Sequence, residues 1–246
     1  MTVSAPFRPY FDIACTACPR LAAFLVDVRL QHADYHARPV APFGDGAAEL
    51  LVIGLAPGMH GANRTGRPFT GDYAGVLLYR VLHRHNFANQ PVGDAVDDGL
   101  QLAGCRITNA VKCLPPDNKP NTAEIRMCNS FLSAELQAAG APRVLLALGR
   151  IAHDATLRAL GLRAAAYPFA HGSAHVIPDG RTLLSSYHCS RYNTNTGRLT
   201  EAMFDAVVAA ARRCVDALPA VGLAGPAGRV GGSDASAIPT TPGSAA

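Results

Sequence analysis

The chain alternates short apolar runs with longer amphipathic segments, and this alternation constrains its fold most strongly. Short apolar runs that stop at Gly or at a polar residue are typical of buried strands, and apolar residues at helical spacing are typical of helices. Strands that alternate with helices form a parallel sheet covered on both faces. The sequence therefore predicts a single three-layer α/β/α domain with a central, mainly parallel sheet. We expect strands within 50–54, 103–110, 143–148, 174–178 and 182–188, and helices over 21–31, 73–84, 122–139, 150–160 and 200–217.

Composition separates the C-terminal segment from the rest of the chain. From Pro219 onward the sequence consists mostly of Gly, Ala, Pro and Ser, with almost no large apolar residue. Such a segment buries too little apolar surface to offset the entropy that ordering would cost. We therefore expect one folded domain over residues 1–218 and a disordered tail over 219–246.

Charge and hydropathy limit the classes of function. The net charge is +4, which permits a polyanionic partner without requiring one. No apolar run approaches the length of a membrane span, and the N-terminal residues lack the pattern of a secretory signal. These features predict a cytoplasmic protein, and we expect it to be a monomer with no membrane partner.

A glycine-rich stretch, GLAPGMHGANRTGRPFTGD, follows the first predicted strand and covers Gly54–Asp72. It leaves backbone uncovered at the carboxyl end of the strand, where open α/β sheets bind ligands. No Gly-Lys-Ser/Thr follows, so the stretch is not a nucleotide-binding P-loop. Phe69 within it could stack on a flat ring or pack the loop onto the core.

Two further polar segments follow predicted strands: TNAVKCLPPDNKP at 108–120 and SYHCSRYNTNTGRLT at 186–200. The carboxyl ends of parallel strands meet at one edge, so the three segments are expected to form one site. Asn109 offers an acceptor and two donors in one plane, which suits the edge of a nucleobase or the cap of a turn. His188 could be catalytic or a structural histidine, and Arg191 and Arg198 could approach phosphates.

The chain has seven cysteines. Cys15 and Cys18 form a CxxC pair, and Cys113 and Cys128 bracket the proline-rich segment. Four thiolates suit either zinc or a [4Fe–4S] cluster, and the alternative is a chance CxxC with two unrelated buried cysteines. Cys105 and Cys214 fit core positions of a strand and a helix.

Together these motifs resemble family 5 of the uracil-DNA glycosylase superfamily, the broad-specificity iron–sulfur glycosylases, over about Phe11 to Asp216. Families 4 and 5 share a CxxC pair near the N-terminus and two later cysteines as [4Fe–4S] ligands. The resemblance therefore implies a [4Fe–4S] cluster held by Cys15, Cys18, Cys113 and Cys128, and it favours iron–sulfur over zinc.

The resemblance implies a monofunctional DNA glycosylase of base excision repair. Such an enzyme flips uracil, hypoxanthine, xanthine or ethenocytosine out of DNA and removes it by hydrolysis. It implies that Asn109 binds the base edge and Phe69 stacks on the ring. Asp72 would stabilise the sugar cation or align water, and His188 would stabilise the departing base. The other substrate-binding residues it implies are Gly54, Ala56, Pro57, Gly58, Asn63, Ser190, Arg191 and Asn193.

The sequence departs from the family pattern at one place. The second motif reads His188-Cys189-Ser190 where His-Pro-Ser is usual, which removes a proline that would fix the backbone. Leu55 stands where family 4 has Glu, as family 5 leads one to expect. Lys112 and Lys119 lie beside the cluster segment and are the only lysines in the motif loops, which disfavours a Schiff-base lyase.

Two other functions stay open at this point. One is a relative that binds uracil-DNA covalently through a histidine in a basic loop, which Arg80–Asn86 superficially resembles. That segment instead fits the end of a helix. The other is an iron–sulfur protein that binds DNA without catalysis, which the joint presence of Asp72, Asn109 and His188 disfavours.

Overall fold

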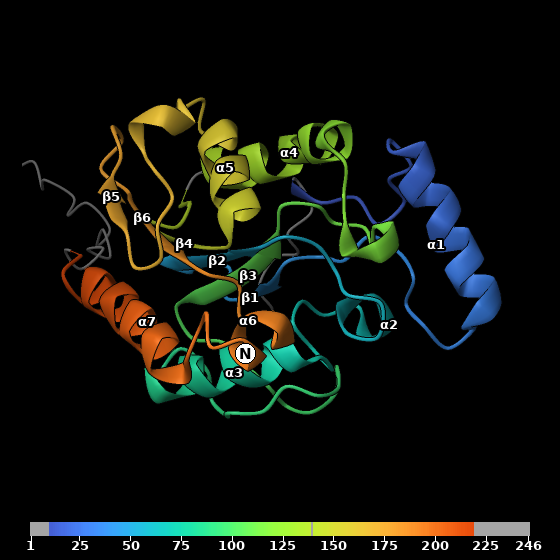
Figure 1. Cartoon of the computed structure of the whole chain (residues 1–246), viewed down its shortest axis with the longest axis horizontal. Helices are drawn as coiled ribbons and strands as arrows, with labels where there is room; N and C mark the ends of the chain where they lie inside the picture. The colour runs from blue at the N-terminus through green and yellow to red at the C-terminus, as the bar shows by residue number, and fades with distance from the viewer. Residues whose placement is uncertain (1–9, 139, 219–246) are drawn as a thin grey trace, which may run out of the picture.

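The computed structural model of the chain describes residues 10–138 and 140–218. A six-stranded sheet forms its centre, in the order β1-β3-β2-β4-β6-β5 (Figure 1). The inner strands β3, β2, β4 and β6 are parallel, and the two edge strands β1 and β5 are antiparallel to their neighbours. The strands are β1 (Phe43–Gly44), β2 (Leu50–Gly54), β3 (Cys105–Asn109), β4 (Val144–Leu148), β5 (Ala174–Val176) and β6 (Thr182–Ser186).

Helices cover both faces of this sheet. On one face lie α3 (Tyr73–Arg84) and α7 (Glu201–Asp216), and on the other lie α4 (Thr122–Gln137) and α5 (Arg150–Ala159) (Figure 1). Leu50 and Val52 pack with the first pair of helices, whereas Leu51 and Ile53 pack with the second. Alternation along β2 thus supplies both cores, because successive side chains of a strand point to opposite faces. The predicted three-layer α/β/α architecture is confirmed.

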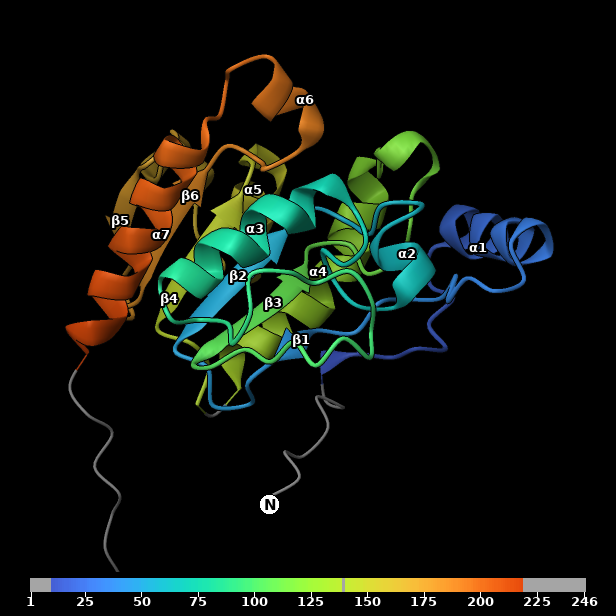
Figure 2. The same cartoon turned by 90° about the horizontal axis from the view of Figure 1, so that it is seen from below.

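A further helix, α1 (Pro19–Gln31), lies at the side of the three layers (Figures 1 and 2). Leu25 and Val28 of α1 pack against Leu114 in a separate small core. The helix begins directly after Cys18, which is its N-cap residue. This attachment brings the N-terminal CxxC pair next to the segment that follows β3.

The long periodic elements match their predicted ranges to within a few residues, and five short elements are additional. These are β1, α2 (Ala62–Thr65), α6 (Arg191–Asn195) and the 3₁₀ turns η2 (Pro116–Asn118) and η3 (Ala164–Ala166). None of them is long enough to carry a periodic pattern in the sequence. Three of them, α2, α6 and η2, lie in segments that we predicted to be functional loops.

The predicted tail over 219–246 lies outside the described residues, so the proposed domain boundary stays a prediction. Within the described ranges, no helix combines the length and the apolar character needed to cross a bilayer.

The register of the parallel strands positions the site. Gly54 of β2 pairs with Asn109 of β3, so both strands end at the same level. β6 ends at Ser186, opposite Leu148 of β4, at the same edge of the sheet. All three polar segments therefore leave the sheet at its carboxyl edge, as the alternation of strands and helices predicts.

Candidate active site

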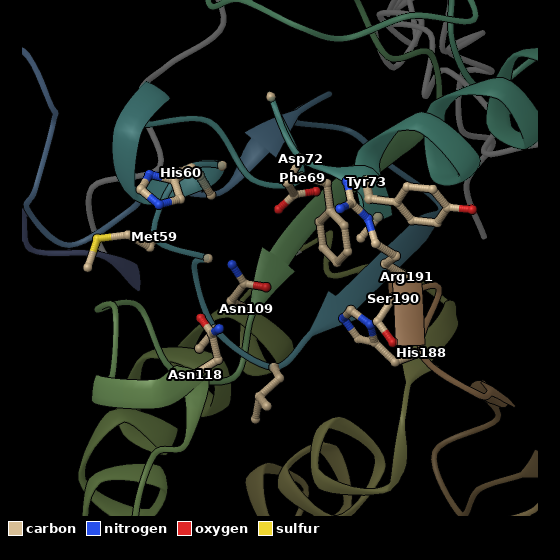
Figure 3. Close-up of a pocket in the computed structure, with 17 residues that line it drawn as sticks. Met59, His60, Phe69, Asp72, Tyr73, Asn109, Asn118, His188, Ser190 and Arg191 are labelled. Atoms are coloured by element: carbon tan, nitrogen blue, oxygen red, sulfur yellow. The ribbon is translucent and has the colours of Figure 1, made fainter. Parts of the chain in front are cut away.

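A cavity of about 570 Å³ opens at the carboxyl edge of the sheet (Figure 3). Its walls come from the glycine-rich stretch after β2, from the segment after β3 and from the segment after β6. The structure thus brings the three polar segments together in one site. The predicted residues that line the cavity are Ala56, Gly58, Phe69, Asp72, Asn109, His188, Ser190 and Arg191.

Four predicted site residues do not line this cavity: Gly54, Pro57, Asn63 and Asn193. Gly54 lies behind it, and an added Cβ there would lie 2.3 Å from Oδ1 of Asn109. Asn63 is fully buried, and its Nδ2 donates to the carbonyl of Met59 at 3.5 Å. Asn193 Nδ2 donates to the carbonyl of His188 at 2.8 Å. Asn63 and Asn193 therefore support the loops, and Gly54 makes room for a neighbouring side chain.

Asn109 is the most buried polar group on the cavity wall. The residue is 3% exposed, and its Oδ1 has no hydrogen-bond partner within the described part of the chain. A buried acceptor without a partner costs on the order of 1–3 kcal/mol. Such a group is retained where a ligand satisfies it, and in this cavity Asn109 presents a fixed amide to whatever enters.

Phe69 forms a flat wall of the cavity. Its ring lies 6.0 Å from the ring of His188 with an angle of 26° between the planes. Its backbone is left-handed, with φ of 54°, which is unusual for a bulky residue. Gly75 permits this conformation, because an added Cβ there would lie 1.8 Å from the carbonyl oxygen of Phe69. The hydroxyl of Tyr79, in α3, donates to the carbonyl of Pro68 at 2.6 Å and so holds the turn that carries Phe69.

An ion pair between Arg67 and Asp98 holds the same turn. Arg67 is buried, and its two Nη atoms bind the two carboxylate oxygens of Asp98 at 2.9 and 2.6 Å. Its Nε donates to Oγ1 of Thr70 at 2.7 Å. These hydrogen bonds from Arg67 hold the pKa of Asp98 well below its usual range. Arg67 and Thr70 lie on both sides of Phe69 in the chain, so the pair fixes the orientation of the aromatic wall.

Asp72 joins the cavity to helix α3. It is the N-cap residue, and its Oδ1 accepts from the backbone N–H of Gly75 at 3.0 Å. Its Oδ2 lies over the backbone of Gly61, where an added Cβ would approach it to 2.3 Å. One carboxylate oxygen is therefore committed to the helix, and the other faces the glycine-rich wall of the cavity.

His188 lies across the cavity from the glycine-rich stretch (Figure 3). Burial lowers its pKa, and the nearby carboxylate of Asp72 partly offsets this effect. A neutral imidazole can donate one hydrogen bond and accept another. Its segment is well anchored without the usual proline, because Cys189 is fully buried and Ser190 caps α6.

One arginine lines the cavity, and two more line a neighbouring hollow. Arg191 is exposed and lies over the ring of Tyr73, 5.2 Å from its centre. Arg198 lies over Tyr187 at 4.6 Å, in a neighbouring hollow that also contains Arg150. A guanidinium group stacked on an aromatic ring keeps its in-plane N–H groups available to donate hydrogen bonds to phosphates.

The four predicted metal ligands, Cys15, Cys18, Cys113 and Cys128, all line one small cavity of about 90 Å³. The backbone N–H of Lys112 donates to Sγ of Cys128 at 3.2 Å. Burial raises the pKa of Cys113 to about 12 and also raises the pKa values of Cys18 and Cys128. Over 10–138 and 140–218, no three His, Cys, Asp or Glu side chains converge closely enough to hold a single metal ion.

Sequence reasoning missed several cavity residues. Met59, His60, Tyr73 and Asn118 also line it. His60 is held by the hydroxyl of Tyr35, at 2.8 Å from its Nδ1. The sequence offers no periodic signal that marks these residues as functional, although Met59, His60 and Asn118 fall within segments that we had selected.

Comparison with known proteins identifies the family. The model of the uracil DNA glycosylase superfamily matches residues 41–212. The chain is 49% identical over 205 residues to a type-5 uracil-DNA glycosylase of Thermus thermophilus, which covers 81% of this chain and 93% of that protein. It is 43% identical to the type-5 enzyme of Pyrobaculum aerophilum, over 76% of this chain and 83% of that protein. It is also 43% identical to the one of Mycobacterium leprae, over 81% and 90%.

The chain therefore belongs to the uracil DNA glycosylase superfamily. Within it the chain groups with the type-5 uracil-DNA glycosylases. A type-4 uracil-DNA glycosylase of Pyrobaculum aerophilum is more distant, at 35% identity over 49% of this chain. The resemblance stated from the sequence motifs is confirmed.

Replacing Asp98 tests how the aromatic wall is held. Asp98→Asn keeps the shape and removes the charge that binds buried Arg67, so it should lower the free energy of unfolding by about 2 kcal/mol. Asp205→Asn is the matched control, because Asp205 pairs with the half-exposed Arg84 and should cost less than about 1 kcal/mol. Denaturant unfolding at pH 7 measures both variants.

The same pair predicts a pH dependence. The pKa of Asp98 is lower in the folded state than in the unfolded state, so the carboxylate stabilises the folded protein. This stabilisation is fully present above the unfolded pKa of about 3.9 and is lost as the pH falls below that value. The wild-type protein should therefore lose stability more steeply than Asp98→Asn below about pH 4. Parallel stability curves of the two proteins would contradict this role of the pair.

Proposed function

We propose that this chain is a monofunctional uracil-DNA glycosylase of base excision repair, acting as a monomer. It would remove uracil from DNA, and also hypoxanthine, xanthine and ethenocytosine. The observation that carries the proposal is Oδ1 of Asn109, which is buried and has no hydrogen-bond partner among the described residues, in a cavity shared with Phe69, Asp72 and His188. The names of its type-5 relatives support the same activity.

A base within a duplex is inaccessible, so the substrate nucleotide must swing out into the cavity. The flat base would lie along Phe69 and His188, whose rings are nearly parallel. Asn109 would accept a hydrogen bond from the ring N–H of uracil through Oδ1 and donate to a base oxygen through Nδ2. These bonds satisfy an amide whose Oδ1 has no partner over residues 10–138 and 140–218.

In the hydrolysis, the bond between the sugar C1′ and the base nitrogen breaks, and its electron pair leaves with the base. Positive charge develops on the sugar, and the carboxylate of Asp72 stabilises it or aligns the attacking water. His188 donates a hydrogen bond to the departing base and stabilises its negative charge. Water adds its oxygen to C1′, and the proton that it releases neutralises the departing base, so the products are the free base and an abasic site.

The cysteine-lined cavity fits a [4Fe–4S] cluster. The donor set is four thiols, and they surround a cavity of about 90 Å³ without converging on one point. A single zinc ion needs four ligands at about 2.3 Å from one centre, whereas a cluster spreads its irons over a larger volume. We assign a structural role to this cluster, with Cys15, Cys18, Cys113 and Cys128 as its ligands.

An assay on labelled duplex DNA with one uracil distinguishes the candidate functions. A glycosylase leaves an abasic site, and alkali then breaks the strand at the position of the uracil. A covalent uracil-DNA-binding relative would give a protein–DNA band that survives denaturation. A protein that only binds DNA would give neither product. We expect the alkali-sensitive break and no denaturation-resistant band.

Replacing Asp72 tests the catalytic assignment. Asp72→Asn keeps the N-cap of α3, because Asn caps helices as well as Asp does. It should lower single-turnover cleavage of uracil-DNA about a hundredfold and leave DNA binding nearly unchanged, since the charge acts in the transition state. Cleavage at the wild-type rate would mean that backbone groups, and not the carboxylate, position the water.

Removing one cysteine tests the cluster. Cys113→Ala should abolish bound iron and the visible iron–sulfur absorbance of the purified protein, because three thiolates remain where four are required. Cys214→Ala is the control, since Cys214 packs against the hydrophobic core and should keep full iron content. Full iron content in Cys113→Ala would contradict the ligand assignment.

Arg191 tests the DNA-binding face. Arg191→Ala should weaken binding to damaged and undamaged duplex alike. It should also reduce the slope of the logarithm of the binding constant against the logarithm of the salt concentration by about one, the value for one lost phosphate contact. Arg213, in the last turn of α7, is the matched control and should leave both quantities unchanged on replacement by Ala. An unchanged salt dependence in Arg191→Ala would mean that α6 lies away from DNA.

A further inference from the structure

His171 lies in the connection between η3 and β5 and does not line the cavity that contains Asn109 and His188. Its Nδ1 accepts a hydrogen bond from the backbone N–H of Tyr187 at 3.2 Å and lies 3.3 Å from the hydroxyl oxygen of Ser186. Ser186 is the last residue of β6, and Tyr187 comes directly before His188. The imidazole of His171 therefore binds the point of the chain from which His188 enters the cavity.

The hydrogen bonds between backbone groups stop just before this point. The N–H of Ser185 donates to the carbonyl of Ser173 at 3.0 Å, and the N–H of Gly172 donates to the carbonyl of Ser185 at 2.8 Å. The N–H of Tyr187, which is half-buried, donates instead to the side chain of His171. A backbone N–H that is shielded from water needs an acceptor. Here an imidazole takes the place that a carbonyl of a longer strand would take.

His171 is an acceptor at neutral pH. Burial lowers its pKa, and a backbone hydrogen bond with Met203 of α7 partly offsets this effect. An ordinary histidine has a pKa of about 6.5, so at pH 7 the ring is neutral and its Nδ1 can accept the N–H of Tyr187. The ring also stacks on the ring of Tyr187, with 5.1 Å between the centres and 22° between the planes.

The direction of the His188 side chain depends on its backbone. Over residues 10–138 and 140–218 its imidazole makes no hydrogen bond, and it faces the ring of Phe69 at 6.0 Å. The backbone is held on both sides instead. After the residue, Nδ2 of Asn193 donates to the carbonyl of His188 at 2.8 Å, and before it, His171 binds Tyr187. A catalytic group that is displaced by about 1 Å can lose about a hundredfold in rate.

We propose that His171 is a positioning residue for His188. By holding the backbone N–H of Tyr187, it sets the direction from which the imidazole of His188 meets the departing base. The inference rests on the proposed glycosylase function and adds to it a residue outside the cavity. Asn193 holds the same short segment from its other end.

Two replacements separate the acceptor of His171 from its ring. His171→Asn removes the ring and keeps an acceptor, because the amide oxygen of Asn occupies nearly the position of Nδ1. His171→Phe keeps a ring that can stack on Tyr187 and removes the acceptor. His175→Phe is the matched control in the neighbouring strand β5, since Nε2 of His175 donates to the carbonyl of Pro168 at 3.1 Å.

Single-turnover cleavage is measured on two duplexes that carry either uracil or 5-fluorouracil at one position. 5-Fluorouracil is the better leaving group, because its fluorine stabilises negative charge on the ring, so its removal depends less on His188. His171→Phe should slow removal of uracil about tenfold, the effect of one weakened hydrogen bond, and removal of 5-fluorouracil less than about threefold. His171→Asn should restore both rates to within about threefold of wild type, and His175→Phe should leave both within about twofold.

Three outcomes would overturn the inference. Equal slowing on the two bases in His171→Phe would mean that the replacement acts on the fold or on DNA binding and not through His188. Wild-type removal of uracil in His171→Phe would mean that the hydrogen bond has no effect on catalysis. A rate in His171→Asn as low as in His171→Phe would mean that the acceptor is not what matters.

Hydrogen exchange at the backbone amide of Tyr187 tests the hydrogen bond without catalysis. Exchange should be slow in the wild type and in His171→Asn and at least about tenfold faster in His171→Phe. Fast exchange in the wild type would overturn the inference even if His171→Phe does not fold. A wild-type protein that cleaves neither base but protects this amide would overturn the proposed function. Cleavage of both bases with an unprotected amide would overturn only the role of His171.

Discussion

The missing side chain at Gly54 is the constraint on which the site depends. Gly54 pairs with Asn109 across β2 and β3, at the point where both strands end. An added Cβ would lie 2.3 Å from Oδ1 of Asn109 and 2.7 Å from the ring of Phe69. Only a glycine lets the amide and the aromatic ring approach each other over bare backbone. The hydrogen-bonding group and the flat wall of the cavity are thereby set in one place by the sheet itself.

The connection after β3 joins this cavity to the cysteine cavity. Asn109 faces the first and Cys113 lines the second, with buried Lys112 between them. Nζ of Lys112 binds Thr108, and it also lies 3.9 Å from Glu135 of α4. A structural cluster at the four cysteines would tie α1, this connection and α4 together. The position of Asn109 and that of the turn carrying Asn118 would then both depend on the cluster.

The sequence alone predicted the layers of the fold and the edge that carries the site, because strand and helix periodicity is a local signal. Asn109 and His188 could be selected because each lies at or near the end of a predicted strand, whereas Asp72 was selected through the family resemblance. The pair of Arg67 with Asp98 could not, since 31 positions separate them and the intervening segment after α3 has no regular pattern. Asn118 was missed for a related reason: its left-handed backbone and its place on the wall are properties of the folded turn. The four cysteines were grouped by the CxxC pair and the proline-rich segment, the family resemblance favoured iron–sulfur over zinc, and the structure brings the four to one cavity.

The central claim is that a flipped base enters the cavity between Phe69, His188 and Asn109. The most direct measurement is a crystal structure of the protein with duplex DNA that carries 2′-fluoro-deoxyuridine, whose fluorine destabilises the sugar cation and so prevents cleavage. The account predicts that the uracil ring lies along Phe69 with its pairing edge on the amide of Asn109 and its sugar beside Asp72. A uracil that stays stacked in the duplex, or that binds outside this cavity, would contradict the account.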